Sequence, residues 1–347
     1  MKKKKVIHLL NTGSYSGAEN VVINIMSNMK QDVDMVYVSP DGDIRQILED
    51  HGLTFYAINK LSYSTIRKVI KDLDPDIIHA HDFTAGMVSA IATSRIPIIN
   101  HLHHNSPWLK KLGIRSILYG LASFRIHTIL TVSNSIMRDF IFGRFANTKS
   151  KVVGNPINVE DIRTKAKTAT LEKSSDIIFL GRLAPPKNPI LFLDIITQVV
   201  KVIPNLKVAM VGDGELRECV ERYIIKHNLT DVVTLYGFVK NPYGLLKNSK
   251  ILCLTSSWEG FGLAVTESFA LGKPVVAAAV GGVVDLVDDT CGKLCYSPSH
   301  YSEHILNLLQ NHDMYLKQSE AAKSKGEKLD NTQRYISCIA ETYELTH

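Results

Sequence analysis

The chain has 347 residues but no run of about 20 apolar residues, so we expect no membrane-spanning helix. It contains only five cysteines, an odd number, and none has the partners of a zinc site. Few, unpaired cysteines are typical of a reducing compartment, which favours a cytoplasmic location. The lysines at positions 2–5 precede an apolar run too short for a signal-peptide core, so we expect a first strand there.

Other sequence signals are also missing. Neither half carries Gly-x-Gly-x-x-Gly after its first strand, which disfavours a dinucleotide-dependent oxidoreductase. The chain contains no low-complexity tract and no short repeat. No recognised motif for reading nucleic acid accompanies the net charge of +6, so we expect no nucleic-acid partner.

The positive charge is confined to the first part of the chain. Residues 1–160 contain 19 Lys and Arg against 13 Asp and Glu, whereas the remainder contains 21 of each. Residues 107–120 combine basic, apolar and aromatic side chains at near-helical spacing, as helices at membrane interfaces do. An ordinary helix that packs its apolar stripe on a sheet has the same pattern. The sequence leaves both interpretations open, and the first would place the protein on the inner face of the plasma membrane.

The remaining sequence predicts an α/β protein with two domains. Strand-like runs alternate with helical segments, which indicates mostly parallel sheets. In the first half these runs are 6–10, 34–39, 53–58, 76–81, 97–103, 128–133 and 151–155. In the second half they begin near residues 176, 206, 232, 250, 274 and 292. The polar stretch 162–175 is expected to connect the domains, and the helical segment 332–345 to return to the first one.

A glycine-rich segment with two glutamates follows the strand 251–256. It runs from Glu259 through Gly260, Phe261, Gly262 and Leu263 to Glu267, and Leu263 opens a helical pattern. The segment therefore lies at the carboxyl end of a strand, where open α/β sheets bind ligands. Backbone N–H groups at the start of the helix suit an anion such as a diphosphate. The glutamates, about 10 Å apart by helix geometry, suit hydroxyl groups on either side of it.

A second segment supplies positive charge at a similar position. A buried strand ends at Gly181, and Arg182 and Lys187 lie in the loop that follows. Two cations five residues apart can neutralise a diphosphate without a metal ion. Two further strands end in glycine, at Gly212 and at Gly237, which precedes Phe238 and Val239.

These elements, in this order, resemble retaining glycosyltransferases of family 4. The resemblance extends over nearly the whole chain. Its markers are the two glutamates with seven residues between them, the Arg182 and Lys187 pair, and the segment Ser16-Gly17-Ala18-Glu19. It implies the GT-B fold, with two Rossmann-like domains facing each other across a cleft. We expect an acceptor-binding domain at 1–160, joined by the helix 330–347, and a nucleotide-sugar-binding domain at 161–329.

The resemblance also implies a role for each marker residue. Arg182 and Lys187 would hold the donor diphosphate, Glu259 would approach the donor sugar, and Glu267 would bind the ribose. The remaining donor-binding residues would be Gly13, Gly17, Gly181, Gly212, Phe238, Val239, Gly260, Phe261, Gly262 and Leu263. Many family members have paired glycines where this chain has Ser16-Gly17.

A histidine completes the implied site. In the resembling family, a histidine at the end of the strand 97–103 contacts the donor sugar. His103 matches it best, and His104 is the alternative. His101, His103 and His104 could also form a metal cluster, but strand alternation sends His104 to the opposite face from the other two.

No other metal site is expected. Asp72, Asp74 and Asp76 precede a strand and so lie at the wrong end of the sheet. Asp41 and Asp43 lie at the correct end but are typical of a turn and a helix start. We therefore expect no metal and no cofactor beyond the nucleotide-sugar substrate.

The sequence thus predicts a retaining, metal-independent transferase. It would move a hexose or N-acetylhexosamine from a nucleotide sugar, UDP by family precedent, to a lipid-linked or polysaccharide acceptor in bacterial surface glycan synthesis. A sugar-nucleotide 2-epimerase shares the architecture but needs additional acids and bases. A non-catalytic subunit of a transferase complex is a further alternative, and the intact set of charged residues argues against it.

Overall fold

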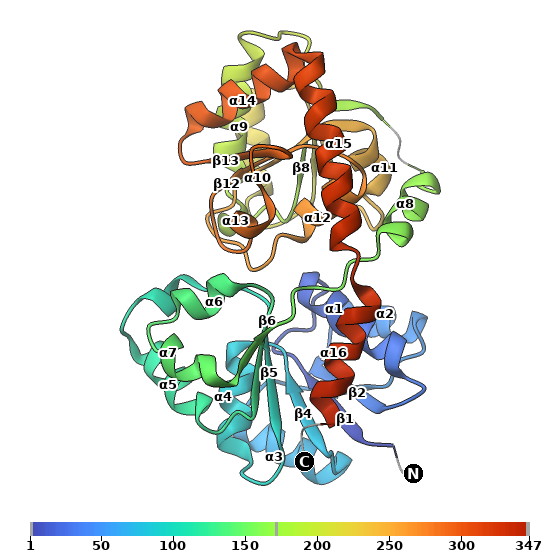
Figure 1. Cartoon of the computed structure of the whole chain (residues 1–347), viewed down its shortest axis with the longest axis vertical. Helices are drawn as coiled ribbons and strands as arrows, with labels where there is room; N and C mark the ends of the chain where they lie inside the picture. Colours follow the sequence, from blue (N-terminus) through green and yellow to red (C-terminus); the bar gives the residue numbers. More distant parts are fainter. Residues whose placement is uncertain (1–2, 171–172, 345–347) are drawn as a thin grey trace. The chain divides into compact units, whose positions relative to one another are not determined.

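The computed structural model describes residues 3–170 and 173–344, which form two compact units (Figure 1). Unit 1 extends to Pro156 and resumes at Thr332, and unit 2 is Ile157–Asn331. These boundaries lie four and two residues from the divisions expected at 160 and 330. The shift arises because the residues just after Pro156 pack on unit 2.

Unit 1 contains a seven-stranded sheet with the order β3-β2-β1-β4-β5-β6-β7, and all its pairs are parallel. Its strands are β1 (Lys5–Leu9), β2 (Asp34–Pro40), β3 (Phe55–Ile58), β4 (Ile77–Ala80), β5 (Ile98–Leu102), β6 (Thr128–Thr131) and β7 (Ser150–Val152). The central strands are buried along their length, as expected for a sheet covered on both faces.

Helices connect these strands and cover the sheet. They are α1 (Gly17–Met29), α2 (Ile44–Asp50), α3 (Tyr63–Leu73), α4 (Phe83–Ala92), α5 (Ile114–Ser123), α6 (Asn134–Asp139), α7 (Gly143–Ala146) and α16 (Thr332–Glu344), with short 3-10 turns η1 (Pro107–Lys110) and η2 (Asn147–Lys149). The C-terminal helix α16 packs with α1 on one face, where Tyr335, Ile339 and Tyr343 join the apolar core.

Unit 2 repeats this architecture with six parallel strands in the order β10-β9-β8-β11-β12-β13. The strands are β8 (Ser175–Leu180), β9 (Val208–Val211), β10 (Val233–Gly237), β11 (Ser249–Leu254), β12 (Val275–Ala278) and β13 (Gly292–Cys295). The helices are α8 (Val159–Lys167), α9 (Pro189–Val200), α10 (Arg217–Lys226), α11 (Tyr243–Lys247), α12 (Leu263–Ala270), α13 (Val283–Leu286), α14 (Pro298–Gln310) and α15 (His312–Leu329), with η3 (Pro185–Lys187).

Two apolar layers stabilise unit 2, one on each face of the sheet. Alternate residues of β8 show this, because Ile177 and Phe179 enter the layer with α9 and α14, whereas Ile178 enters the layer with α12. At about 25 cal/mol per Å² of apolar surface, such layers supply most of the free energy of folding.

Two sequence-based expectations are wrong in detail. The stretch 162–175 is not simply a connection, since Val159 and Ile162 of α8 pack against Ala270 within unit 2. The segment 107–120 is not one helix, because η1 ends at Lys110 and α5 begins at Ile114 after Gly113. Within residues 3–170 and 173–344, no helix has both the length and the apolar character to cross a membrane.

Candidate functional site

The strand order of unit 2 reverses between β8 and β11. The chain proceeds outward from β8 to β9 and β10, and then from β11 to β12 and β13 on the other side. In open parallel sheets, ligands bind beyond the carboxyl ends of the strands at such a reversal. The loops after β8 and β11 contain Arg182, Lys187 and Glu259, so the sequence-predicted charges gather at this position.

Hydrogen bonds hold these two loops together. The Ser257 N–H donates to the Pro186 carbonyl at 2.8 Å. The Thr255 hydroxyl lies within bonding distance of two carbonyls, those of Lys187 at 3.1 Å and Asn188 at 3.0 Å. The loop backbones are therefore fixed before any ligand binds.

Lys187 and Glu259 form an ion pair across the two loops. Lys187 Nζ lies 2.5 Å from Glu259 Oε1, and the Ser256 hydroxyl donates to the same oxygen at 2.7 Å. Glu259 is only 9% exposed, so its carboxylate depends on these partners for solvation. The ion pair therefore places the Lys187 ammonium group beside a Glu259 carboxylate that is oriented to accept hydrogen bonds. Sequence reasoning missed Ser256, which had no distinguishing signal beyond its place at a strand end.

A glycine pair after β12 shapes the backbone on the other side of Glu259. A Cβ atom on Gly281 would lie 1.8 Å from the Glu259 carbonyl oxygen, and Gly281 has φ +54°. Only glycine fits there. The Gly282 N–H donates to the Gly260 carbonyl at 3.2 Å. Sequence reasoning missed this pair, although two adjacent glycines after a strand were a usable signal.

Arg182 lies on the same loop as Lys187 but extends into solvent. Its side chain is 72% exposed, and its Nη2 lies 3.0 Å from Glu215 Oε2. The backbone at Gly181, just before Arg182, packs closely against Gly212, where a Cβ atom would lie 2.0 Å from the Gly181 carbonyl oxygen. An exposed ion pair contributes little to folding, so Arg182 can exchange Glu215 for an anionic ligand at little cost.

Glu267 lies on α12, whose first residue is Leu263. The Tyr243 hydroxyl donates to Glu267 Oε1 at 3.0 Å, and burial raises the pKa of the carboxyl although this bond opposes the rise. Gly262 is the N-cap in the left-handed region, with φ +99° and no side-chain cap bond. The Val265 N–H donates to the Gly262 carbonyl at 2.9 Å, and the two N–H groups before it, at the start of α12, have no side-chain cap and suit an anion. Tyr243 had not been singled out from the sequence.

The other predicted donor-binding residues of unit 2 surround these groups. Phe261 and Leu263 are half-buried and pack against α8 residues, while Gly260 follows Glu259 directly. Val239 packs into the apolar layer beside α12, but Phe238 is 69% exposed. The structure therefore places a largely exposed aromatic ring in the loop after β10.

In unit 1, the loop after β1 carries the predicted glycines. Gly13 packs against the backbone of Pro40 and Asp41, at the end of β2. Gly17 is the first residue of α1, and the Ser16 hydroxyl donates to the buried carboxylate of Glu19. Burial raises the pKa of Glu19. Glu19 therefore fixes the start of α1 from inside the unit.

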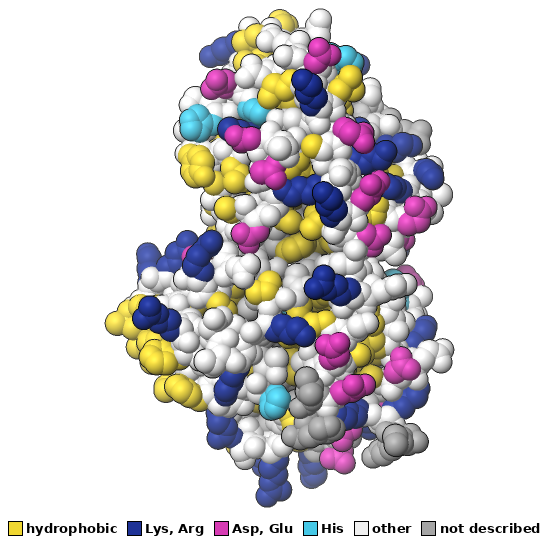
Figure 2. Space-filling view, in the orientation of Figure 1, with side chains coloured by type: hydrophobic (Ala, Val, Ile, Leu, Met, Phe, Trp, Pro, Cys, Tyr) yellow, Lys and Arg dark blue, Asp and Glu magenta, His cyan; other side chains and the backbone are white. Residues whose placement is uncertain are grey.

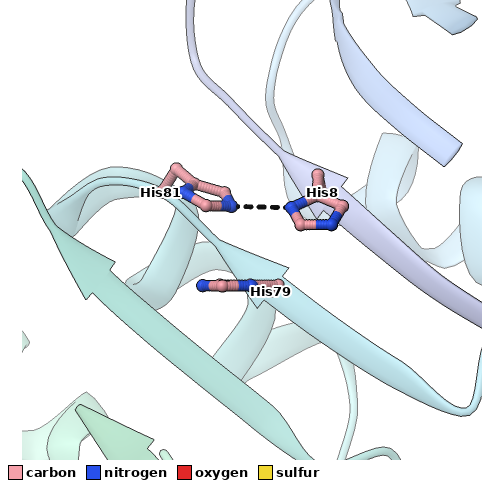
Figure 3. A group of neighbouring side chains, drawn as sticks. All are labelled: His8, His79 and His81. Atoms are coloured by element: carbon pink, nitrogen blue, oxygen red, sulfur yellow. Dashed lines mark hydrogen bonds between the residues drawn. The ribbon is translucent and has the colours of Figure 1, made fainter. Parts of the chain in front are cut away.

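Five histidines cluster on one face of the unit 1 sheet. His8 is in register with His79 on the neighbouring strand, and His81, His101 and His103 occupy the same face by alternation. Figure 3 shows His81 above His79, with a hydrogen bond that joins the rings of His81 and His8. The rings of His101 and His103 are 4.2 Å apart. His104 instead meets Phe83, with ring centroids 5.6 Å apart.

Two of the aspartates considered as metal ligands, Asp41 and Asp72, are paired with cations. Asp41 Oδ2 lies 2.7 Å from Arg45 Nη2, and Asp72 Oδ2 lies 2.6 Å from Lys68 Nζ. In the described part of the chain, the groups that could bring three metal-ligating atoms together consist of histidines, namely His8, His79 and His81, and His81, His101 and His103.

Comparison with known proteins defines the family. A model described as "Glycosyltransferase Family 4" matches residues 15–161, and a model described as "Glycosyl transferases group 1" matches residues 160–325. Together they cover both units. The chain belongs to glycosyltransferase family 4.

The relatives of this glycosyltransferase support the assignment. An uncharacterized glycosyltransferase of Methanocaldococcus jannaschii, MJ1059, is 28% identical over 64% of this chain, although the match spans only 60% of that relative. The UDP-Gal:α-D-GlcNAc-diphosphoundecaprenol α-1,3-galactosyltransferase of Escherichia coli is 23% identical over 81% of this chain and 80% of that protein.

A solved structure establishes the fold. Anabaena Alr3699/HepE, in complex with UDP and glucose, superimposes with a TM-score of 0.85, at 22% identity, over 99% of this chain and all of that one. The prediction of two Rossmann-like domains of the GT-B type is therefore confirmed. The match at this identity concerns the fold alone, and the roles of individual residues remain predictions.

Proposed function

We propose that this glycosyltransferase moves a hexose or N-acetylhexosamine from a UDP-sugar to a lipid-linked or polysaccharide acceptor, with retention at the anomeric carbon. The observation that carries the proposal is the Lys187–Glu259 ion pair at the strand-order reversal of unit 2, with Arg182 on the same loop. In this proposal the two cations bind the diphosphate, Glu259 binds the sugar, and Glu267 binds the ribose.

The chemistry follows from these groups. The bond between the anomeric carbon and the diphosphate oxygen breaks, and Lys187, Arg182 and the N-terminus of α12 offset the charge that grows on that oxygen. The acceptor oxygen bonds to the same face of the anomeric carbon. Its proton passes to the departing diphosphate, so the step needs no protein base. The carboxylate of Glu259, held by Lys187 and Ser256, is suited to accept hydrogen bonds from sugar hydroxyls.

The relatives suggest the acceptor. The name of the E. coli protein specifies UDP-galactose as donor and a sugar on diphosphoundecaprenol as acceptor. The HepE structure contains UDP and glucose. A role in surface glycan synthesis on a lipid carrier agrees with both.

Donor hydrolysis without acceptor tests this function. We expect the purified protein to release UDP slowly from one of a panel of UDP-hexoses and UDP-N-acetylhexosamines. We expect EDTA to leave the rate unchanged, because the cations replace a metal. A 2-epimerised sugar nucleotide in the product would indicate the epimerase instead, and no turnover of any donor would indicate a non-catalytic subunit. Loss of activity on chelation, restored by manganese, would overturn the metal-free reaction.

The structure also bears on membrane association. On α5, the buried residues are Ser116, Tyr119, Ala122 and Ser123, so the apolar stripe does not pack on the sheet. Large apolar side chains project outward from α5 and its neighbours, forming what we call the α5–α7 face: Leu112, Ile114, Ile117, Leu118, Leu121, Phe124, Ile141 and Phe145. Figure 2 shows apolar side chains at this edge of unit 1 with basic residues among them.

Charge around the α5–α7 face matches anionic lipid. Exposed Lys111 and Arg115 lie on the α5 side, and Arg144 lies on α7. A cavity of about 600 Å³ beside Ile141 is lined by Lys110, Arg138 and Arg144. Cations around exposed apolar side chains are typical of surfaces that dock on anionic membranes. We propose that unit 1 docks there on the anionic membrane that carries the acceptor.

Vesicle binding checks the docking proposal. Replacing Lys111, Arg115 and Arg144 with Gln should weaken binding to vesicles with anionic lipid roughly 100-fold, since each charge contributes on the order of 1 kcal/mol. Thermal stability should not change, because exposed charges add little to folding. The matched control replaces three exposed lysines of unit 2, Lys201, Lys226 and Lys317, and should bind as the parent does. Equal loss in both variants would indicate net charge alone.

A further inference from the structure

Buried histidines lie on the unit 1 sheet beneath the C-terminal helix α16. His8, His79 and His101 are fully buried, and each lies two residues after an apolar residue of the layer that packs α1 and α16 on the sheet. His81 and His103 lie two residues further along the chain on the same face. The imidazoles therefore continue this layer to the carboxyl edge of the sheet.

Two tyrosines of α16 contact three of these rings. The Tyr343 oxygen lies 2.8 Å from His79 Nδ1 and 3.4 Å from His8 Nε2. The ring centroids of Tyr335 and His101 are 6.4 Å apart. As the last helix of the described chain, α16 is buried along a single stripe. Elements near a chain end with few buried contacts open at a lower free energy than central strands, so α16 is the part of this layer that opens most easily.

The folded cluster accommodates only neutral rings. Among the described residues, the five rings hydrogen-bond to one another and to Tyr343, and no carboxylate bonds to any of them. Ring centroids are 4.1 Å apart for His79 and His81, and 4.2 Å apart for His101 and His103. A charge on one ring would therefore be buried without a counter-charge and would repel its neighbours. Burial accordingly lowers the pKa of each of these histidines below its ordinary value.

Titratable groups on the surrounding elements do not alter this balance. They are Tyr335, Cys338 and Tyr343 on α16, Glu19 on α1, Tyr37 on β2, Asp82 at the start of α4 and His104 after β5. The Glu19 carboxylate accepts the Ser16 hydroxyl, and Asp82 accepts the Ala85 N–H at 2.6 Å. Burial raises the pKa of both α16 tyrosines well above the ordinary value, so they stay neutral. Neither the carboxylates nor the phenols therefore stabilise an imidazolium in the folded cluster.

We propose that these histidines make α16 an acid-sensitive latch. His8, His79 and His101, which contact α16, gain protons only after α16 leaves the sheet, so α16 is released as the pH falls. In the closed state the same rings are neutral and pack as part of the apolar layer. The contacts of Tyr343 with His79 and His8 then hold the helix in place.

The direction of the effect follows from proton linkage. Burial lowers the pKa of these three histidines while α16 is in place, whereas a solvated histidine has a pKa of about 6.5. Below that value the open state binds more protons and its population grows as the pH falls, while above it the latch keeps its full stability. Between pH 7.5 and pH 6.0, each histidine raises the equilibrium constant for opening roughly 4-fold, so the three raise it about 50-fold.

The latch acts on one of the two places where the chain passes between the units. The chain leaves unit 1 after Pro156 and returns at Thr332, the first residue of α16 (Figure 1). Release of α16 would free the second passage from unit 1 and leave the first one unchanged. The latch thus affects a connection between the units rather than the loops of the candidate donor site.

A metal ion fits the cluster less well. Imidazole nitrogens bound tetrahedrally to zinc at 2.0–2.1 Å lie about 3.3–3.4 Å apart. The nitrogens that join His81 to His8 and to His103 are 2.9 and 3.0 Å apart, the separation of an N–H···N hydrogen bond. The rings of His79 and His81 are also stacked, which directs their lone pairs side by side rather than toward a shared ion.

Amide hydrogen exchange at pH 7.5 and pH 6.0 tests the latch in the wild-type protein. After correction for the pH dependence of the chemical exchange rate, we expect the protection of α16 to fall about 50-fold, while that of α15 in unit 2 stays the same. Strands β1 and β4 should remain better protected than α16 at the lower pH. Equal protection of α16 at both pH values would overturn the proposal. So would equal protection of α16, β1 and β4 at pH 6.0, which would indicate unfolding of the whole unit, or one equivalent of zinc in the purified protein.

Variants then count the histidines that take part. His79→Gln removes one titrating ring from beneath α16 and should reduce the change in α16 protection from about 50-fold to about 15-fold. The matched control is His127→Gln, which should keep the full change, because His127 is exposed in unit 1 and can gain a proton with α16 in place. Each result is a ratio within one variant, so a general loss of stability does not affect the comparison. If His79→Gln does not fold, His101→Gln provides the same count, and the full 50-fold change in either folded variant would contradict the latch.

Discussion

Replacing Lys187 with Met should lower turnover by about 100- to 1,000-fold, because Lys187 is placed to stabilise charge that develops only as the diphosphate leaves. The ammonium group lies between the loops after β8 and β11, held by Glu259 at 2.5 Å. Arg182→Met should lower turnover by a similar factor, because Arg182 is also placed to stabilise the charge on the departing diphosphate. Steady-state kinetics with the donor identified by hydrolysis measure both effects, and normal turnover in either variant would contradict the assignment.

Stability must be separated from catalysis in the Lys187 variant. Removing the cation leaves the nearly buried Glu259 carboxylate without its counter-charge, which we expect to destabilise the fold by about 1–3 kcal/mol. The double variant Lys187→Met with Glu259→Gln should regain stability but not turnover. Lys293→Met, which breaks an exposed ion pair with Asp289, is the control for loss of a lysine and should leave turnover unchanged.

The fold could be predicted from the sequence because its strands are apolar runs bounded by polar or glycine residues. Each of the thirteen strands of the described chain falls at an expected run, and the confirmed fold follows from their alternation with helices. The boundary after unit 1 was harder to place. Residues 162–175 look polar, yet Ile162 and Val159 form a single apolar stripe on α8 that fixes this helix to unit 2.

The candidate site was only partly accessible to sequence reasoning. Charged residues at strand ends were identifiable because parallel strands bring their carboxyl ends to one edge. Tyr243, which donates to Glu267, was not identifiable, because it acts through a tertiary contact that no local pattern indicates. Ser256 lies only three residues before Glu259, and its hydrogen bond to that residue is local. Similarly, alternation put His101 and His103 on one face, but the hydrogen bonds that join His81 to His8 and to His103 depend on the order of β1, β4 and β5 in the sheet.

The outward face of α5 illustrates the same limit. Its sequence suits either a buried or an interfacial helix, since both have apolar residues at helical spacing. In the structure, Ser116, Tyr119 and Ala122 of α5 face inward, whereas Ile114 is 79% exposed, and the interfacial role of this outward face stays a proposal. Which face a helix buries depends on its tertiary neighbours, here α4, and the composition of the helix does not encode them.

The two glutamates should separate nucleotide binding from sugar transfer. Glu267→Gln should weaken binding of free UDP by about 10- to 100-fold, since a carboxylate that accepts hydroxyl bonds contributes more than a neutral amide. Because burial raises the pKa of Glu267, wild-type affinity should fall as pH decreases through a midpoint above the ordinary glutamate value. Protonation removes the charge that accepts the ribose hydroxyls, and Glu267→Gln should lack this dependence.

Glu259→Gln should behave in the opposite way. UDP affinity should stay within a few-fold of wild type, because the proposed partner of Glu259 is the sugar, while turnover of the UDP-sugar should fall by about 100-fold or more. Calorimetric titration with UDP and steady-state kinetics on the same samples provide the comparison. Glu327→Gln, which alters an exposed carboxylate paired with Arg163 on α8, is the matched control and should change neither. Equal loss of UDP affinity in the Glu259 and Glu267 variants would show that both carboxylates serve the nucleotide, and the sugar would then need a different acceptor in unit 2.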